Sequence, residues 1–303
     1  MQNLAPIALF VFNRPEHTRR TIKFLRQNLL ANETRLFIFS DGAEDQRDFV
    51  KVNEVREQIF RTEGFKSVEI IERPRNFGLA NSIITGVSRL VNEYGKVIVI
   101  EDDLITSPHT LQYFNDALTA FEKEERVMHI GAYMYPIDYS GLPETFFFRA
   151  ATSWGWATWK RAWKDFEPDI DVLMADFDQQ KKNLFSIDGT MNYWKQMTDF
   201  KSGKNNSWAI RWYASMFLKG GLSINPSQSL VNNIGHDGTG VHSGTTEIFT
   251  VAIQHKPVRY FPTEISENPY AYEALKNYFK NRKGSIWARI ARYLNQRTPR
   301  WTR

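Results

Sequence analysis

Three consecutive carboxylates, Glu101, Asp102 and Asp103, directly follow the apolar run Val97–Ile100. Like charges crowded at the end of an apolar segment repel one another, and a bound cation would relieve that repulsion. Mg²⁺ and Mn²⁺ prefer oxygen ligands, and they often bind through one or two carboxylates together with substrate phosphates. Such a metal bridges a diphosphate and stabilises it as a leaving group. The alternative is a solvated acidic turn, but the abrupt change from apolar to acidic residues favours a metal site.

Two earlier apolar runs also end in polar residues. Asn13 and Arg14 follow the run 7–12, and Asp41 follows the run 35–40. The guanidinium of Arg14 offers paired donors to phosphate oxygens, although it could equally form a surface salt bridge. Asp41 precedes a glycine and could be an ordinary turn residue.

The elements that would position these residues follow from hydrophobic periodicity. Apolar runs predict strands at 7–12, 35–40, 68–71 and 97–100, with helical patterns between them. This alternation predicts an α/β fold with a doubly wound, mostly parallel sheet. In such sheets ligands bind beyond the carboxyl ends of the strands, where all the polar residues above fall. Beyond Pro108 the predicted elements are helices at 109–122, 193–199 and 210–218 and strands at 127–132 and 145–148.

The second half contains two further chemical features. Trp154 and Trp156 belong to a tight cluster of tryptophans around Gly155, which could be a platform for a sugar ring or ordinary core packing. Residues 234–242 hold three glycines, two histidines and one aspartate, a composition typical of a loop that wraps a ligand. The alternative for this loop is a polar surface turn.

Charge is distributed unevenly along the chain. Residues 276–303 contain nine Lys or Arg and no Asp or Glu, so the remainder is mildly acidic, which argues against a nucleic-acid partner. Ile286, Trp287, Ile290 and Leu294 lie among these charges, a pattern typical of an amphipathic helix at an anionic membrane surface. A disordered terminus and a helix docked on the body are the alternatives. The absence of Cys, of a secretory signal and of any long apolar stretch predicts a cytoplasmic protein, peripheral on the membrane at most.

Several segments, in order, resemble the GT-A class of glycosyltransferases. Residues 99–104, followed by Ser-Pro and Tyr-Phe, are similar to N-acetylglucosaminyltransferase I and its relatives, as is the opening 10–15. Residues 75–80 resemble a segment of many bacterial GT-A enzymes. Residues 154–159 and 207–212 resemble bacterial transferases that build surface polysaccharides. The resemblance covers residues 6–242 unevenly, and it implies a GT-A domain at 1–262, with a nucleotide-sugar half at 1–108 and an acceptor half at 109–262, followed by a basic tail at 263–303.

The resemblance also implies roles for individual residues. It implies that a UDP-sugar is the donor, that Mn²⁺ or Mg²⁺ assists, and that a glycan or lipid-linked glycan is the acceptor. The metal would be held by Asp103, with a late histidine such as His236 as a second ligand. The residues implied for the nucleotide and donor sugar are Asn13, Arg14, Asp41, Asn76, Gly78, Glu101 and Asp102. The residues implied for the acceptor or sugar are Trp154, Trp156, Trp208 and Arg211.

One position departs from the resemblance. An inverting transfer needs a general base, and N-acetylglucosaminyltransferase I carries an Asp where this chain has Ala209. The candidates for the base are therefore Asp237, His242 and Asp199, in that order. The same departure leaves open a non-catalytic protein that binds nucleotides or glycans on this scaffold. A sugar-nucleotide pyrophosphorylase is disfavoured, because residues 13–16 lack the glycine-rich loop of those enzymes.

Overall fold

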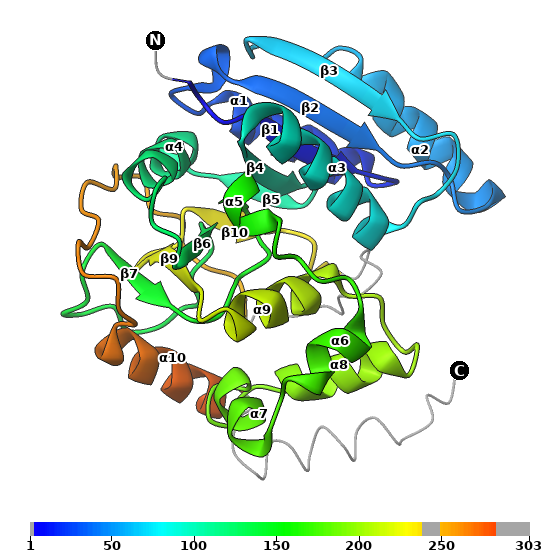
Figure 1. Ribbon diagram of the computed structural model, residues 1–303. Helices are drawn as coiled ribbons and strands as arrows, with labels where there is room; N and C mark the ends of the chain where they lie inside the picture. The colour runs from blue at the N-terminus through cyan, green and yellow to red at the C-terminus, as the bar shows by residue number, and fades with distance from the viewer. Residues whose placement is uncertain (1–2, 238–248, 283–303) are drawn as a thin grey trace, which may run out of the picture.

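The computed structural model describes residues 3–237 and 249–282, and an eight-stranded sheet forms its centre (Figure 1). The strands run in the order β3-β2-β1-β4-β8-β6-β9-β7. Their bounds are β1 (Ile7–Val11), β2 (Arg35–Ser40), β3 (Ser67–Glu72), β4 (Lys96–Glu101), β6 (Val127–Gly131), β7 (Thr145–Phe148), β8 (Trp156–Trp159) and β9 (Leu222–Pro226). A separate two-stranded sheet pairs β5 (Leu104–Thr106) with β10 (Val231–Asn233).

The first four strands form an all-parallel half of the sheet. The helices between them are α1 (Pro15–Arg26), α2 (Gln46–Ile59) and α3 (Leu79–Tyr94). Because crossovers between parallel strands are right-handed, the connections β1-α1-β2 and β2-α2-β3 place α1 and α2 on one face, and the return from β3 to β4 places α3 on the other. With helices on both faces, β1 is buried along its whole length, and β4 is buried at its four central residues.

The other half of the sheet is mixed. β8 pairs antiparallel with both β4 and β6, and β7 pairs antiparallel with β9, while β6 and β9 are parallel. The helices of this half are α4 (Thr110–Ala120), α5 (Lys160–Trp163), α6 (Ile170–Ala175), α7 (Gln179–Phe185), α8 (Tyr193–Lys201) and α9 (Trp208–Leu218). The predicted α/β class and mainly parallel sheet are confirmed. The strands β5, β8, β9 and β10 were not predicted.

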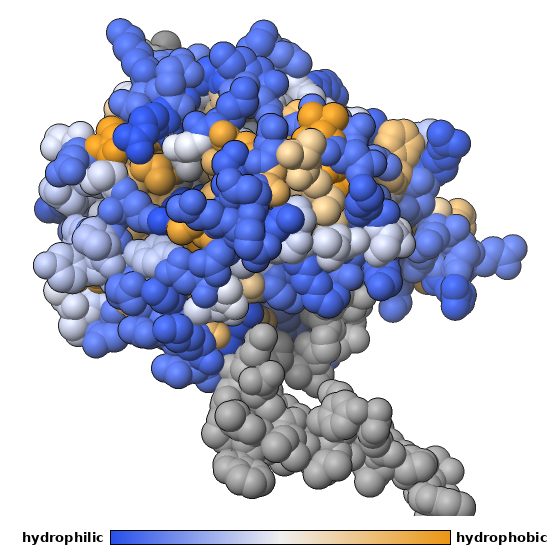
Figure 2. Space-filling view, turned by 60° about the horizontal axis from the view of Figure 1, so that its bottom comes forward, coloured by the Kyte–Doolittle hydropathy of each residue, from blue (hydrophilic) through white to orange (hydrophobic). Residues whose placement is uncertain are grey.

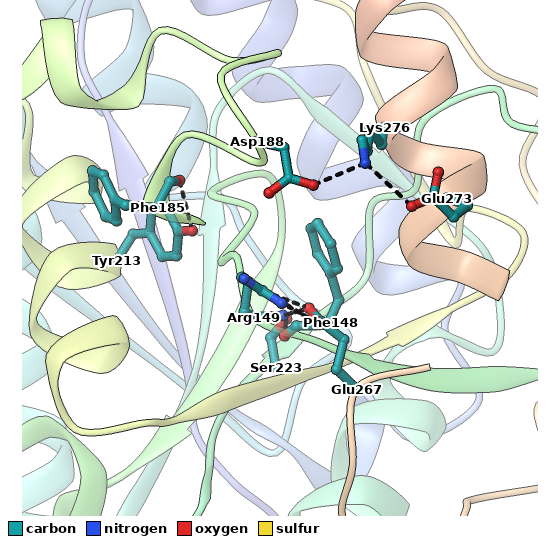
Figure 3. A network of polar contacts seen from close by, with 9 residues as sticks. All are labelled: Phe148, Arg149, Phe185, Asp188, Tyr213, Ser223, Glu267, Glu273 and Lys276. Carbon is teal, nitrogen blue, oxygen red and sulfur yellow. Dashed lines mark hydrogen bonds and ion pairs between the residues drawn. The ribbon is translucent and has the colours of Figure 1, made fainter. Parts of the chain in front are cut away.

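The helix α10 (Pro269–Asn281) packs on the body of the protein. Its residues Ala271, Leu275 and Phe279 are buried in a core cluster with α7 and α9. Two polar contacts connect this segment to the body (Figure 3). Arg149 pairs with Glu267 just before the helix, and Lys276, within the helix, lies 2.8 Å from Asp188. The predicted basic tail therefore begins as a docked segment, while Ile286, Trp287, Ile290 and Leu294 lie outside the described residues.

We expect this docking to depend on the Arg149–Glu267 pair. Glu267 accepts from Arg149 Nε at 2.9 and 3.0 Å and also from its backbone amide at 2.9 Å, and both side chains are mostly buried. Glu267→Gln should lower the free energy of unfolding by about 1–3 kcal/mol, because it leaves a largely desolvated guanidinium without a counter-charge. Urea denaturation checks this. Arg19→Gln, which breaks an exposed pair with Glu16, is the matched control and should change stability by less than about 1 kcal/mol. Equal effects of the two variants would contradict the prediction.

The surface is mostly hydrophilic on the face that Figure 2 shows, with hydrophobic residues in small groups between hydrophilic ones. Within the described ranges, no helix combines the length and the apolarity needed to span a bilayer.

Candidate active site

The carboxyl ends of β1 and β4 bring Arg14 against the acidic triplet. Arg14 Nη1 donates to Asp103 Oδ2 at 3.0 Å and lies 3.7 Å from Asp102 Oδ1. Asp102 also accepts from the Phe12 amide at 3.3 Å, and its backbone carbonyl accepts from the Thr21 hydroxyl at 2.8 Å. The strand ends and the start of α1 therefore fix the carboxylates and the guanidinium in one place.

The segment after β10 forms the opposite wall of this site. The Ile234 amide donates to the Asp103 carbonyl at 2.8 Å, and Arg14 Nη2 donates to the Gly235 carbonyl at 3.3 Å. A Cβ at position 235 would lie 2.6 Å from Arg14 Nη2 and closer still to Asp103 Oδ2. Only a glycine lets the backbone approach the carboxylate this closely.

The same segment contacts α1 through a histidine. His17 Nε2 lies 3.2 Å from Asp237 Oδ2 and 3.3 Å from the Ile234 carbonyl oxygen. The side chain of His17 is 11% exposed, and that of Asp237 is 45% exposed. Asp237 is therefore partly exposed at the rim of the site.

Burial makes the acidic triplet electrostatically unfavourable on its own. Desolvation, followed by the neighbouring carboxylates, raises the pKa of Glu101 well above its usual range. Desolvation and the charge of Asp103 raise the pKa of Asp102 to about 7, against the opposing effect of Arg14. One guanidinium thus faces three carboxyl groups, and a bound cation would favour their ionised forms.

The residues present fit a metal that takes most of its ligands from substrate and water. In the described part of the chain, no three His, Asp or Glu side chains form a complete metal site. The candidate metal ligands are Asp103 and His236. Among the described residues, both ring nitrogens of His236 are buried and have no hydrogen-bond partner. His236 follows Gly235, which lies against Asp103. One carboxylate together with substrate phosphates matches the partial protein ligation that Mg²⁺ accepts, whereas an imidazole ligand is more typical of softer divalent metals.

The end of β2 forms a neighbouring subsite around Asp41. Its Oδ1 accepts from the amides of Phe77 and Gly42 at 2.8 and 2.9 Å, and its Oδ2 accepts from the Gly78 amide at 3.0 Å. Asn76 donates to the Gly42 carbonyl at 2.9 Å and accepts from the Gly78 amide. Asp41 therefore orders the loop before α3, and Gly78, at a φ of 73°, supplies the left-handed turn that this loop needs.

The predicted sugar platform divides into two groups. Trp154 is partly buried and packs edge-on against Tyr133 at 4.6 Å and against His236 at 5.2 Å. Trp156 and Trp208 instead stack on each other at 5.1 Å and are 0% and 4% exposed. Rings this deeply buried offer no face to a sugar, so these two tryptophans pack the core, while the platform role of Trp154 stays a prediction.

Four other predicted site residues remain to be placed: Arg211, Asn13, Asp199 and His242. Arg211 is buried, and its guanidinium donates to the carbonyls of Ser207 and Pro168, so it stabilises α9. Asn13 donates to Asp48 at 2.6 Å. Asp199 is on α8, ion-paired with Lys195. His242 lies outside the described residues.

Three site residues were missed at the level of sequence: His17, Thr21 and Gly235. The pairing of β10 with β5 brings the 234–237 segment to Asp103. Each of these two strands has only three residues. Elements of three residues give no periodic signal, so nothing in the sequence linked position 235 to position 103.

The raised pKa values predict how stability depends on pH. The folded-state pKa of Asp102, about 7, exceeds the ordinary value of 3.8, so the folded protein holds a proton that the unfolded chain releases. The free energy of unfolding without metal should therefore fall from pH 4 to pH 7, and Asp102 alone should contribute at most about 4 kcal/mol of this fall. The stabilisation by Mn²⁺ should grow over the same range, because the metal binds the ionised form. Melting curves with and without Mn²⁺ test this, and a metal effect independent of pH would contradict it.

No family model matches the chain, and no curated protein matches it in sequence. Among solved structures, it is similar to the mannosyltransferase PcManGT from Pyrobaculum calidifontis in complex with GDP-Man and Mn²⁺. That match has 8% identity and a TM-score of 0.41 over 71% of this chain and 68% of that one. It is also similar to S. aureus TarS, with 15% identity and a TM-score of 0.33 over 46% of this chain and 23% of that one. The structure of TarS residues 1–349 matches with 14% identity and a TM-score of 0.36 over 51% of this chain and 47% of that one. The chain thus spans less than half of either TarS chain. All three TM-scores are below 0.5.

Proposed function

We propose that this protein is a metal-dependent glycosyltransferase that transfers a hexose or N-acetylhexosamine from a UDP-sugar to a hydroxyl of a glycan acceptor. The observation that carries the proposal is the buried contact of Arg14 with Asp102 and Asp103 at the carboxyl ends of β1 and β4. This arrangement supplies a guanidinium for a diphosphate and an excess of carboxylate for a divalent cation.

In this proposal each part of the site has one task. Asp103 and His236 would hold Mn²⁺ or Mg²⁺, which would supply positive charge to neutralise a departing diphosphate. Arg14 binds the diphosphate oxygens, and Glu101 and Asp102 face the donor sugar and ribose. The loop ordered by Asp41, with Asn76 and Gly78, and the neighbouring Asn13 border the nucleotide. Trp154 borders the sugar on the acceptor side.

Asp237 is the proposed general base of an inverting transfer. Its carboxylate would accept the proton of the acceptor hydroxyl while that oxygen forms a bond to the anomeric carbon and the bond to the diphosphate breaks. Its partial exposure beside His17 supports this role, because the acceptor has to reach it from solvent. The basic residues after position 275 favour an acceptor at an anionic membrane surface, such as a lipid-linked glycan.

Two measurements test the proposal. A panel of UDP-sugars and GDP-mannose is screened with Mn²⁺ for a rise in melting temperature, since a ligand that binds only the folded form stabilises it. Release of the nucleoside diphosphate is then followed with Mn²⁺ and with a chelator. Stabilisation by at least one donor, with metal-dependent release, is expected. The proposal fails if no donor raises the melting temperature and none is cleaved.

A non-catalytic nucleotide- or glycan-binding protein is the second candidate, favoured by Ala209. The same screen separates the two: donor-induced stabilisation without transfer to glycan extracts or slow hydrolysis would support binding alone.

A further inference from the structure

The start of α1 contacts the site at three positions. Arg14 is the N-cap residue and has a non-helical backbone, whereas His17 and Thr21 are four residues apart within the helix and therefore lie on the same side of it. Arg14 contacts Asp103 and the Gly235 carbonyl, and Thr21 donates to the Asp102 carbonyl. Between them, His17 contacts Ile234 and Asp237. The helix therefore holds the acidic strand end and the 234–237 segment in a fixed relation.

The two contacts of His17 share a single nitrogen. Nε2 lies 3.3 Å from the carbonyl oxygen of Ile234, which only accepts hydrogen bonds, so Nε2 carries the hydrogen. The same N–H points toward Asp237 Oδ2 at 3.2 Å. One buried donor thus bridges the backbone of residue 234 and the carboxylate of residue 237, which fixes that carboxylate relative to Asp103.

We propose that His17 is a positioning residue that orients the Asp237 carboxylate toward the acceptor hydroxyl. This inference rests on the proposed function, in which Asp237 is the general base. A misplacement of about 1 Å in such a group costs about 10²-fold in rate, so the orientation has a measurable effect.

The test compares three variants. His17→Ala removes the bridge, and His17→Gln keeps a side-chain N–H donor of similar reach. Thr18→Val is the matched control, because the Thr18 hydroxyl is buried on the same helix without a hydrogen-bond partner in the described structure. His17→Ala should lower kcat for transfer by about 10²-fold with less than about 3-fold change in donor KM. His17→Gln should recover most of the lost kcat, and Thr18→Val should match the wild type.

A double-mutant cycle shows whether His17 acts through Asp237. Adding His17→Ala to Asp237→Asn should cause no further loss of kcat, because the group being positioned is already gone. Additive losses would overturn the inference, as would a His17→Ala enzyme with wild-type kcat. A parallel loss of donor affinity would assign His17 to donor binding instead and would equally overturn it.

Hydrogen exchange separates this inference from the proposed function. The amides of Ile234 and Gly235 donate to the Asp103 carbonyl and to Asn233 Oδ1, so they are protected. Their exchange should become faster in His17→Ala and stay unchanged in His17→Gln and Thr18→Val. If no donor is turned over but exchange follows this pattern, the proposed function fails while the positioning contact stands. Unchanged exchange in His17→Ala refutes the contact itself.

Discussion

Asp103→Asn is expected to reduce metal-dependent sugar transfer by at least about 10³-fold, which corresponds to about 4 kcal/mol of transition-state stabilisation. The asparagine keeps the size of the side chain but loses the charge that would attract the cation. The melting temperature without metal should not fall by much, because the lost contact with Arg14 is offset by weaker repulsion of Glu101 and Asp102. Nucleotide release with Mn²⁺, together with a melting curve, measures both effects.

Asp116→Asn is the control for this variant. Asp116 is a partly buried carboxylate on α4 whose pKa is raised by burial, but it lines a separate surface pocket of about 530 Å³ with His109 and Arg259. Its amide variant should keep wild-type transfer and wild-type response to Mn²⁺. A normal rate in Asp103→Asn would remove the metal site from the mechanism.

Gly235→Ala should be the second most damaging change, although it adds one methyl group. The new Cβ would overlap Arg14 Nη2 and the Asp103 carboxylate, so either the 234–237 segment or both charged groups must move. We expect a loss of about 10²-fold in kcat/KM from the displaced site. We also expect a loss of about 1–3 kcal/mol in the free energy of unfolding from the steric overlap.

Gly141→Ala distinguishes this steric effect from ordinary glycine replacement. Gly141 has a φ of 79° and no atom within 4 Å of an added Cβ, so alanine there costs about 1 kcal/mol of backbone strain and nothing else. Its transfer rate should match the wild type. If Gly235→Ala were equally active, the close approach would have no functional role.

The parallel half of the fold could be predicted because three of its four strands are apolar runs bounded by polar residues. Burial on both faces produces such runs, and β1, β2 and β4 show them. In the mixed half, β6 and β7 were predicted as strands at 127–132 and 145–148, whereas β8 and β9 were not. β8 is the clearest case: Trp156–Trp159 resembles an aromatic cluster in sequence, and only its pairing with β4 and β6 makes it a strand.

The candidate site, like the fold, was predicted only in part from the sequence. Arg14 and the acidic triplet were found because they end predicted strands of one sheet. His17 gave no signal, since a single histidine in a helix is ordinary and its partners are more than 200 residues away. Trp156 and Trp208 were assigned to the acceptor or sugar through the resemblance, with core packing as the alternative for the cluster that contains Trp156, and both are buried in the core.

The pairing of β5 with β10 has a consequence for biosynthesis. Asp103 and Gly235 are in contact only when Leu104 pairs with Asn233, so the carboxylates lack their opposite wall until the ribosome has released the chain beyond position 237. A nascent chain that has completed its parallel strands thus still exposes an acidic edge without the wall formed by residues 234–237. Under the proposed function, donor binding would then follow only after synthesis has passed both halves of the chain.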